Sequence, residues 1–395
     1  MTMLGSARLQ SSVDVNVFVA SQLLARNPIS RAFFDREADR LATICQEMSQ
    51  RFLRGGRLLA FGQGAAATDA QHVSVEFVHP VIVGKRALPA LDLSAAFETW
   101  LPAIVREDDI VMVFGGAGAD VRLKPDATNG ATKGTLARAR DCGALTLSWP
   151  DPDPDPFISQ ELIEILYHTL WETVHVFFEH REGGHDDLGD SGFLYPFLGD
   201  APQDTSGILA DVAASIRAKA ADDERLRETV AATQADRIAA AISTVLQRLD
   251  AGATLLMFGN GGSATDANDW AIDCVGASIP ALSLSMEPAN VTAIANDIGA
   301  DAIFLRQLIA HGRRGDVAVA ISTSGGSANV IAALDEARKR GMLTLALLGY
   351  DGGEIVRRGL VDLPIVVPCD YIPRIQEVQA SIYHVMTEAW RQCRA

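Results

Sequence analysis

Long hydrophobic runs are missing from this sequence, and cysteine is scarce. No run of about 18 apolar residues occurs, and the first ten residues, MTMLGSARLQ, contain no apolar signal segment. The five cysteines form neither a metal-type spacing nor an even framework, which favours reduced thiols. We therefore expect a cytoplasmic protein that spans no membrane and depends on no disulfide.

Basic charge is also in short supply. Lysine and arginine total 34 against 50 acidic residues, for a formal net charge of −16. Such a surface repels nucleic acid and anionic membranes, so neither is an expected partner. Phosphate can still bind locally, because backbone amides at a helix N-terminus attract anions regardless of net charge. Hydrophobic content of 48% and charged content of 21% are otherwise typical of globular proteins.

The sequence repeats itself. FGQGAAATDAQHVSVE begins at Phe61, and FGNGGSATDANDWAID begins 197 residues later, at Phe258. Near the ends of the two copies, SQELIEILYH finishes at His168 and IQEVQASIYH finishes at His384. This indicates a tandem duplication, with one domain over residues 1–185, a Gly/Asp/Pro-rich linker over 186–205 and a second domain over 206–395.

Each copy alternates helical and strand patterns. Apolar residues recur at helical spacing over about 13–54 and 206–249, and each stretch stops at a glycine, Gly55 or Gly252. Short apolar strands follow, namely RLLAFG, DIVMVFG and ALTLSW in the first copy and TLLMFG, DVAVAIS and LTLALLG in the second. The alternation predicts an α/β fold in which each parallel sheet is covered by helices on both faces.

The second copy carries two loops suited to phosphate. Each loop follows a predicted strand and precedes a helix. Free backbone amides and the helix dipole favour an anion at this position. The hydroxyl groups there can donate hydrogen bonds to the anion or cap the helix. Open α/β sheets bind ligands at this edge. The expected phosphate-binding residues are Asn260, Gly261, Gly262, Ser263, Ser322, Thr323, Ser324 and Ser327. The alternative interpretation is that the loops are only caps and tight turns.

The first copy has lost these groups. Ala66 stands where the second copy has Ser263, Gly115-Gly116-Ala117 replaces the Ser-Thr-Ser run, and Asp120 replaces Ser327. The segment VTAIANDIGADAIF, from Val291, has no counterpart. We therefore expect no phosphate to bind in the loops of the first copy.

The second copy resembles the SIS (sugar isomerase) domain. The resemblance rests on five motifs that follow one another along the chain, GNGGS, AIAND, ISTSGGSANVIAAL, LGYDGGE and RIQE. The similarity is greatest to the phosphoheptose isomerase branch, which includes a non-catalytic protein that binds the bacterial replication initiator. It implies two doubly wound, flavodoxin-like three-layer SIS domains, each preceded by a helical segment, and a sugar phosphate ligand. Because the family forms tetramers with sites at subunit contacts, we expect a homodimer that makes a pseudo-tetramer.

The resemblance also implies a zinc site and an acid–base pair. In the family, a His and a Glu one helical turn apart combine with a Gln and a His on the last helix. The first copy has all four types and the second has aspartates at two of the positions, giving the candidate sets His72, Glu76, Gln160 and His168, and Asp269, Asp273, Gln376 and His384. The family's proton-transfer residues correspond to Glu76, His168 and His384.

These assignments predict one composite site per chain, with phosphate held by the second copy and proton transfer supplied by Glu76 with a histidine. The point equivalent to Glu76 lies about 15 Å along its helix from the phosphate loop of its own copy, farther than a seven-carbon sugar phosphate reaches. The expected activity is aldose–ketose isomerisation, an intramolecular oxidoreduction, of sedoheptulose 7-phosphate. A non-catalytic phosphosugar-binding or replication-initiator-binding protein, or an isomerase of a different sugar phosphate, remains the alternative.

Overall fold

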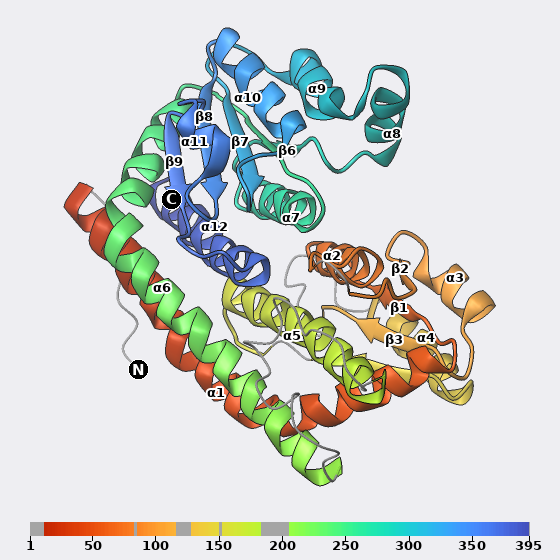
Figure 1. Ribbon diagram of the computed structural model, residues 1–395. Coiled ribbons are helices and arrows are strands. Elements are labelled where there is room, and N and C mark those ends of the chain that lie inside the picture. Colours follow the sequence, from red (N-terminus) through yellow and green to blue (C-terminus); the bar gives the residue numbers. More distant parts are fainter. Residues whose placement is uncertain (1–11, 83–84, 116–127, 150–151, 183–204, 395) are drawn as a thin grey trace. The chain divides into compact units, whose positions relative to one another are not determined.

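The computed structural model describes residues 12–82, 85–115, 128–149, 152–182 and 205–394 (Figure 1). The chain forms two compact units. Unit 1 comprises Met1–Asn27 and Asp223–Ala395, and unit 2 comprises Pro28–Asp222. The linker expected at 186–205 falls outside the described residues except at its last position.

Unit 2 is built on a four-stranded parallel sheet with the order β2-β1-β3-β4. Its strands are β1 (Leu58–Phe61), β2 (Ala90–Asp92), β3 (Ile110–Val113) and β4 (Leu145–Ser148). Its helices are most of α1 (Ser12–Leu53), α2 (Ala66–Val78), α3 (Phe97–Ile104), α4 (Thr128–Asp141), α5 (Pro156–Glu182) and the start of α6 (Thr205–Asp250).

Unit 1 has a five-stranded parallel sheet with the order β6-β5-β7-β8-β9. Its strands are β5 (Leu255–Phe258), β6 (Ala281–Ser283), β7 (Val317–Ser322), β8 (Leu343–Leu348) and β9 (Leu363–Val366). Besides parts of α1 and α6, its helices are α7 (Gly262–Gly276), α8 (Pro288–Asp297), the 3₁₀ helix η3 (Ala300–Ala302), α9 (Ile303–His311), α10 (Ala328–Lys339), α11 (Gly353–Arg357) and α12 (Ile372–Arg394).

Both sheets have the strand order of a flavodoxin-like doubly wound fold, and successive residues of each strand enter different cores. In β5, Leu255 and Met257 join a cluster with α7 and α12, whereas Leu256 and Phe258 join a cluster with α9 and α10. The strands of unit 2 divide their side chains in the same way. Because both of their faces are covered, the central strands β1, β3, β5 and β7 are buried along their whole length and are apolar except for the last residue of β7, as expected from the sequence.

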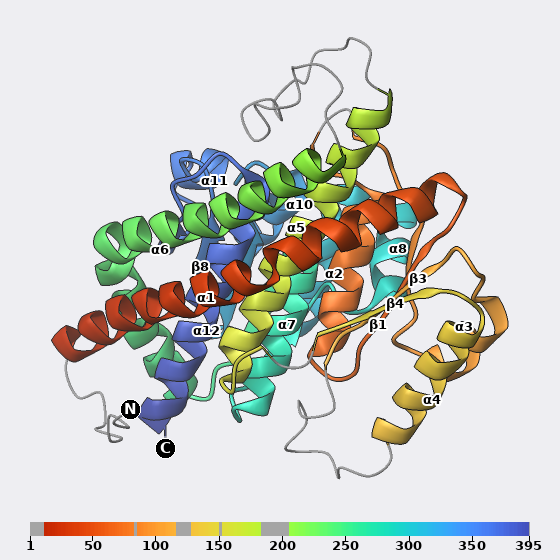
Figure 2. The same cartoon turned by 90° about the horizontal axis from the view of Figure 1, so that it is seen from below.

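The two long helices are each divided between the units. In unit 1, the first part of α1 lies beside the second part of α6, where Asn27 donates to the carbonyl of Glu224 at 3.2 Å (Figure 1, Figure 2). In unit 2, the second part of α1 lies beside the first part of α6, where Arg217 pairs with Asp39 at 2.6 Å. Each sheet is therefore covered by helical segments from both sequence repeats.

The ends of the two long helices agree with the sequence prediction. Gly55 and Gly252 follow them with φ of 89° and 88°, a backbone conformation that glycine adopts without strain. Among the described residues, no helix is both long and apolar enough to cross a membrane.

Candidate functional site

The two predicted phosphate loops lie side by side in unit 1. They follow β5 and β7, which are adjacent parallel strands, so both leave the carboxyl edge of the sheet. The side-chain amides of Asn260 and Asn329 join them through two hydrogen bonds, of 2.9 and 2.8 Å. Since β5 has β6 on its other side, this is the point at which the chain reverses its direction along the sheet, where ligands bind in such folds.

The second loop is shaped by a third segment, residues 349–355, which overlaps the LGYDGGE motif. The amide of Ile355 donates to the carbonyl of Gly325 at 3.0 Å, and that of Gly349 donates to Thr323 at 2.9 Å. A Cβ at Gly325 would lie 2.2 Å from the carbonyl oxygen of Gly352, and φ at Gly325 is 60°. The glycines therefore allow two backbones to touch and hold the loop in one shape.

Two hydroxyl oxygens of the second loop accept hydrogen bonds from amides of the same loop. Ser322 accepts a hydrogen bond from the amide of Gly325 at 3.2 Å, and Ser324 accepts one from Gly326 at 3.3 Å. Ser327 is the N-cap residue of α10 but makes no side-chain capping bond, so the expected capping role is wrong at this position. A hydroxyl that accepts through its oxygen can still donate its proton to a phosphate oxygen.

In the first loop, Gly261 precedes α7 with φ of 56°, and Gly262 and Ser263 form the first turn of the helix. Asn260, Gly261 and Ser324 are exposed, so an anion can reach this edge. The corresponding loop of unit 2 begins α2 at Ala66 and carries no hydroxyl there. Gly116, Ala117 and Asp120 lie outside the described residues.

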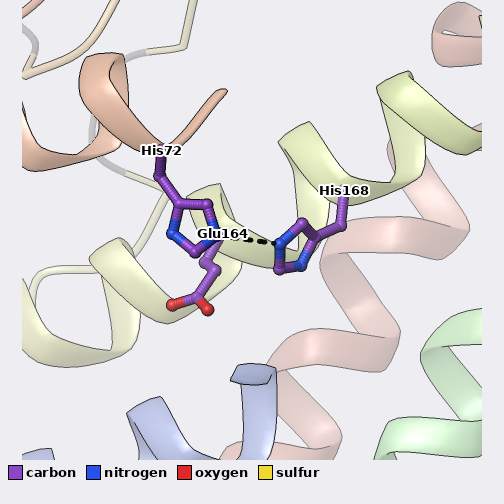
Figure 3. A group of neighbouring side chains, drawn as sticks. All are labelled: His72, Glu164 and His168. Carbon is purple, nitrogen blue, oxygen red and sulfur yellow. Dashed lines mark hydrogen bonds between the residues drawn. The ribbon is translucent and has the colours of Figure 1, made fainter. Parts of the chain in front are cut away.

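The sequence-predicted His72 and His168 meet in the core of unit 2. Their Nε2 atoms are 3.4 Å apart and their rings are nearly perpendicular, at 78° (Figure 3). The Tyr167 hydroxyl lies 2.9 Å from Nδ1 of His72, which leaves Nε2 as the atom directed at His168. Glu76 follows one turn after His72 on α2, with its Oε1 3.8 Å from the same Nε2.

A carboxylate that we did not predict completes this group. Glu164 lies on α5, one turn before His168, and ligand atoms of His72, Glu164 and His168 lie within 4.8 Å of one another. Gln160 is one turn further away and donates to Asp69 at 3.2 Å, while its buried Oε1 accepts no hydrogen bond. Two imidazoles, carboxylates and an available amide oxygen are a donor set that zinc accepts.

Unit 1 gathers the equivalent positions differently. Nε2 of His384 lies 3.3 Å from Asp273 and 3.6 Å from Asp269. Tyr383 donates to Asp269 at 2.9 Å, just as the matching Tyr167 contacts His72. These three acidic and imidazole groups could also hold a metal, although Asp273 is only partly buried. Gln376 is buried on the same helix, α12.

Glu164, Asn329 and the two tyrosines were absent from the predicted set. The tyrosines had a signal, since Tyr-His ends both copies of the last-helix repeat. Asn329 stands inside the second loop motif but outside its hydroxyl run. No sequence signal pointed to Glu164, because Ala380 occupies the matching position in the second copy.

Comparison with known proteins gives consistent matches. A family profile described as SIS domain matches residues 220–349. The phosphoheptose isomerase of Citrifermentans bemidjiense is 45% identical over 157 residues, which are 38% of this chain and 81% of that protein. The phosphoheptose isomerase of Geobacter sulfurreducens is 42% identical over 187 residues, 46% of this chain and 96% of that protein.

A solved structure matches nearly the whole chain. It is the C-terminal domain of glucosamine-fructose-6-phosphate aminotransferase from Francisella tularensis, with a TM-score of 0.51, 10% identity, and coverage of 96% of this chain and 95% of that one. At this identity the likeness concerns the fold alone. The fold of nearly the whole chain, not of one copy alone, is therefore found in another protein.

Proposed function

We propose that this chain, which belongs to the phosphoheptose isomerase family of SIS-domain proteins, interconverts the ketose and aldose forms of a sugar phosphate. Within that class we propose sedoheptulose 7-phosphate as its substrate, because the relatives that share 42–45% of their aligned residues are phosphoheptose isomerases.

The observation that carries this proposal is the pair of joined loops in unit 1. They bring the amides at the start of α7 and the hydroxyls of Ser322, Thr323 and Ser324 to one edge of the sheet, where Ser324 is exposed and Ser322 is buried. Convergent amides, hydroxyls and a helix N-terminus bind a phosphate without any lysine or arginine. The sugar would extend from this anchored end.

Isomerisation moves a proton between the two carbons of the carbonyl pair, which requires a base that can also act as an acid. A carboxylate beside a histidine occurs in each unit, as Glu76 with His72 and His168, and as Asp273 with His384. We assign the proton transfer to Glu76, whose carboxylate lies 3.8 Å from Nε2 of His72 in the same unit. Glutamate is the family's residue type at the position of Glu76, whereas Asp273 is one methylene shorter.

The donor sets of both units fit a divalent metal, and His72 and His168 in unit 2 fit zinc. A bound zinc would supply Lewis-acid polarisation of the substrate's carbonyl oxygen. The chain's own contribution is to hold these side chains in place. Tyr167 orients His72, and Tyr383 orients Asp269, each through a hydrogen bond of 2.9 Å.

The test is to incubate the purified protein with a panel of ketose phosphates of five, six and seven carbons in deuterated water. Isomer formation with deuterium at the carbon beside the carbonyl supports the proposal, and the substrate with the highest kcat/KM identifies the sugar. Tight binding of a phosphosugar with neither product nor deuterium exchange would instead favour the non-catalytic alternative.

A further inference from the structure

Glu164 lies near His72 and His168 in unit 2, and ligand atoms of all three lie within 4.8 Å of one another. It precedes His168 by one turn of α5, and His72 faces the two of them from α2 (Figure 3). All three side chains are buried, with exposures of 2% for His72 and 0% for Glu164 and His168. A buried group made of two imidazoles and a carboxylate is costly unless each is bonded or shares a cation.

The spacing of the histidines suits a shared metal ion. Zinc–nitrogen bonds of 2.0–2.1 Å at a tetrahedral angle place two nitrogen ligands about 3.3 Å apart. The Nε2 atoms of His72 and His168 are 3.4 Å apart. The Tyr167 hydroxyl at Nδ1 of His72 fixes the ring, as the outer hydrogen bond of a metal-bound histidine does.

Glu76 is placed less favourably. Its nearest carboxylate oxygen is 3.8 Å from Nε2 of His72, and it is not part of the group whose ligand atoms all lie within 4.8 Å. The resemblance had assigned it as both ligand and proton carrier. With Glu164 present, Glu164 can serve as the metal ligand and Glu76 as the proton carrier.

The second copy supports this division by contrast. Its last helix has Ala380 in place of Glu164, and there both carboxylates, Asp269 and Asp273, come from α7. Each copy therefore retains three possible ligands, with one from α2 and two from α5 in unit 2, and two from α7 and one from α12 in unit 1. A carboxylate on the last helix accompanies two histidines only in unit 2.

We propose that Glu164 is the third protein ligand of a zinc centre with His72 and His168, and that Glu76 is not a ligand. Three protein ligands leave a fourth position open, as in catalytic zinc sites. The set of two nitrogens and one oxygen also suits zinc better than the single nitrogen and two oxygens of Asp269, Asp273 and His384. Unit 2 is therefore the tighter zinc site. This inference rests on the proposed function only for the proton-transfer role of Glu76.

The experiment measures zinc affinity of the full chain by competition with a chromophoric chelator, comparing Glu164→Gln with Glu76→Gln. Both changes keep side-chain size and remove one charge. We expect Glu164→Gln to weaken zinc binding by roughly 100-fold or more, beyond the 10–100-fold typical of losing an outer-shell partner. Glu76→Gln should change it by less than tenfold. Cobalt substitution should show an altered visible spectrum only in Glu164→Gln.

The reverse ranking, with Glu76→Gln losing zinc and Glu164→Gln retaining it, would overturn the proposal. So would equal affinity in the wild type and in Glu164→Gln. If Glu164→Gln fails to fold by circular dichroism, Glu164→Asp replaces it, and an unchanged cobalt spectrum in that variant contradicts ligation. Zinc binding is measured without turnover, so an inactive protein that follows the expected ranking would reject the proposed function and leave this inference standing.

Discussion

Asn260 and Asn329 bond to each other twice, amide to carbonyl in both directions, at 2.9 and 2.8 Å. Asn260 lies in the first predicted phosphate loop, between β5 and α7. Asn329 lies in the first turn of α10, directly after the second predicted loop. The pair is the side-chain connection between two loops that are 69 residues apart in sequence. It positions the amides and hydroxyls that we propose to hold phosphate.

Removing this connection should weaken substrate binding more than turnover. Asn329→Ala deletes both hydrogen bonds, and because they are solvent-exposed we expect a loss of about 1 kcal/mol, or roughly fivefold in KM. Steady-state kinetics measures the effect, with Thr233→Ala on the exposed face of α6 as the control. A fall in kcat at constant KM would mean that the pair serves another purpose.

Phosphate binding should be confined to one unit. Ser324→Ala removes a hydroxyl that we expect to donate a charge-assisted bond, worth roughly 1.5–3 kcal/mol, so phosphosugar affinity should fall about tenfold or more. Titration calorimetry should find one phosphosugar site per chain, because the first loop of unit 2 has Ala66 in place of Ser263. Two equal sites per chain would contradict the assignment.

The proton-transfer assignment can be tested by ranking two isosteric changes. Glu76→Gln should lower kcat at least 100-fold, the usual scale of general-base catalysis, while leaving folding and phosphosugar binding intact. Asp273→Asn, at the matching position of unit 1, should have a much smaller effect. The opposite ranking would show that unit 1 carries out the reaction with its own residues, and the assignment to Glu76 would be abandoned.

We expect the chain to form a homodimer, since closed symmetry is the usual outcome for soluble oligomers and the resemblance to the family implies an assembly of four SIS domains. Light scattering coupled to size exclusion should give twice the chain mass of 42.2 kDa at micromolar concentration. A monomer over the whole concentration range would disprove this expectation.

The cysteines should differ sharply in reactivity. Burial raises the pKa of the Cys45 and Cys274 thiols well above the ordinary value, mainly by desolvation, so both stay neutral and unreactive from pH 7 to 9. Cys142 is exposed. A thiol reagent should label Cys142 quickly in the native protein and reach Cys45 and Cys274 only on denaturation, which peptide mass mapping can follow. Early labelling of either buried thiol would contradict their placement.

Local patterns in the sequence predicted most of the elements correctly. The runs that form β1, β3, β4, β5, β7 and β8 are rich in apolar residues and bounded by turns, and the long helices end where glycine allows a positive φ. The edge strands β2, β6 and β9 were missed. β2 and β6 have three residues each, of which one is polar, and a proline, Pro364, stands inside the run that forms β9.

The sequence by itself determined that two similar α/β domains exist, and it predicted loops suited to phosphate in the second copy and a grouping of His72 with His168 in the first. Repeats, helical spacing and strand–loop–helix order are local or periodic properties, so they can be recognised in one sequence alone. Only the tertiary structure decided how α1 and α6 are divided between the units, that Asn260 meets Asn329, and that Glu164 joins the two histidines. Each of these depends on which residues, distant in sequence, the packing of the apolar cores brings into contact.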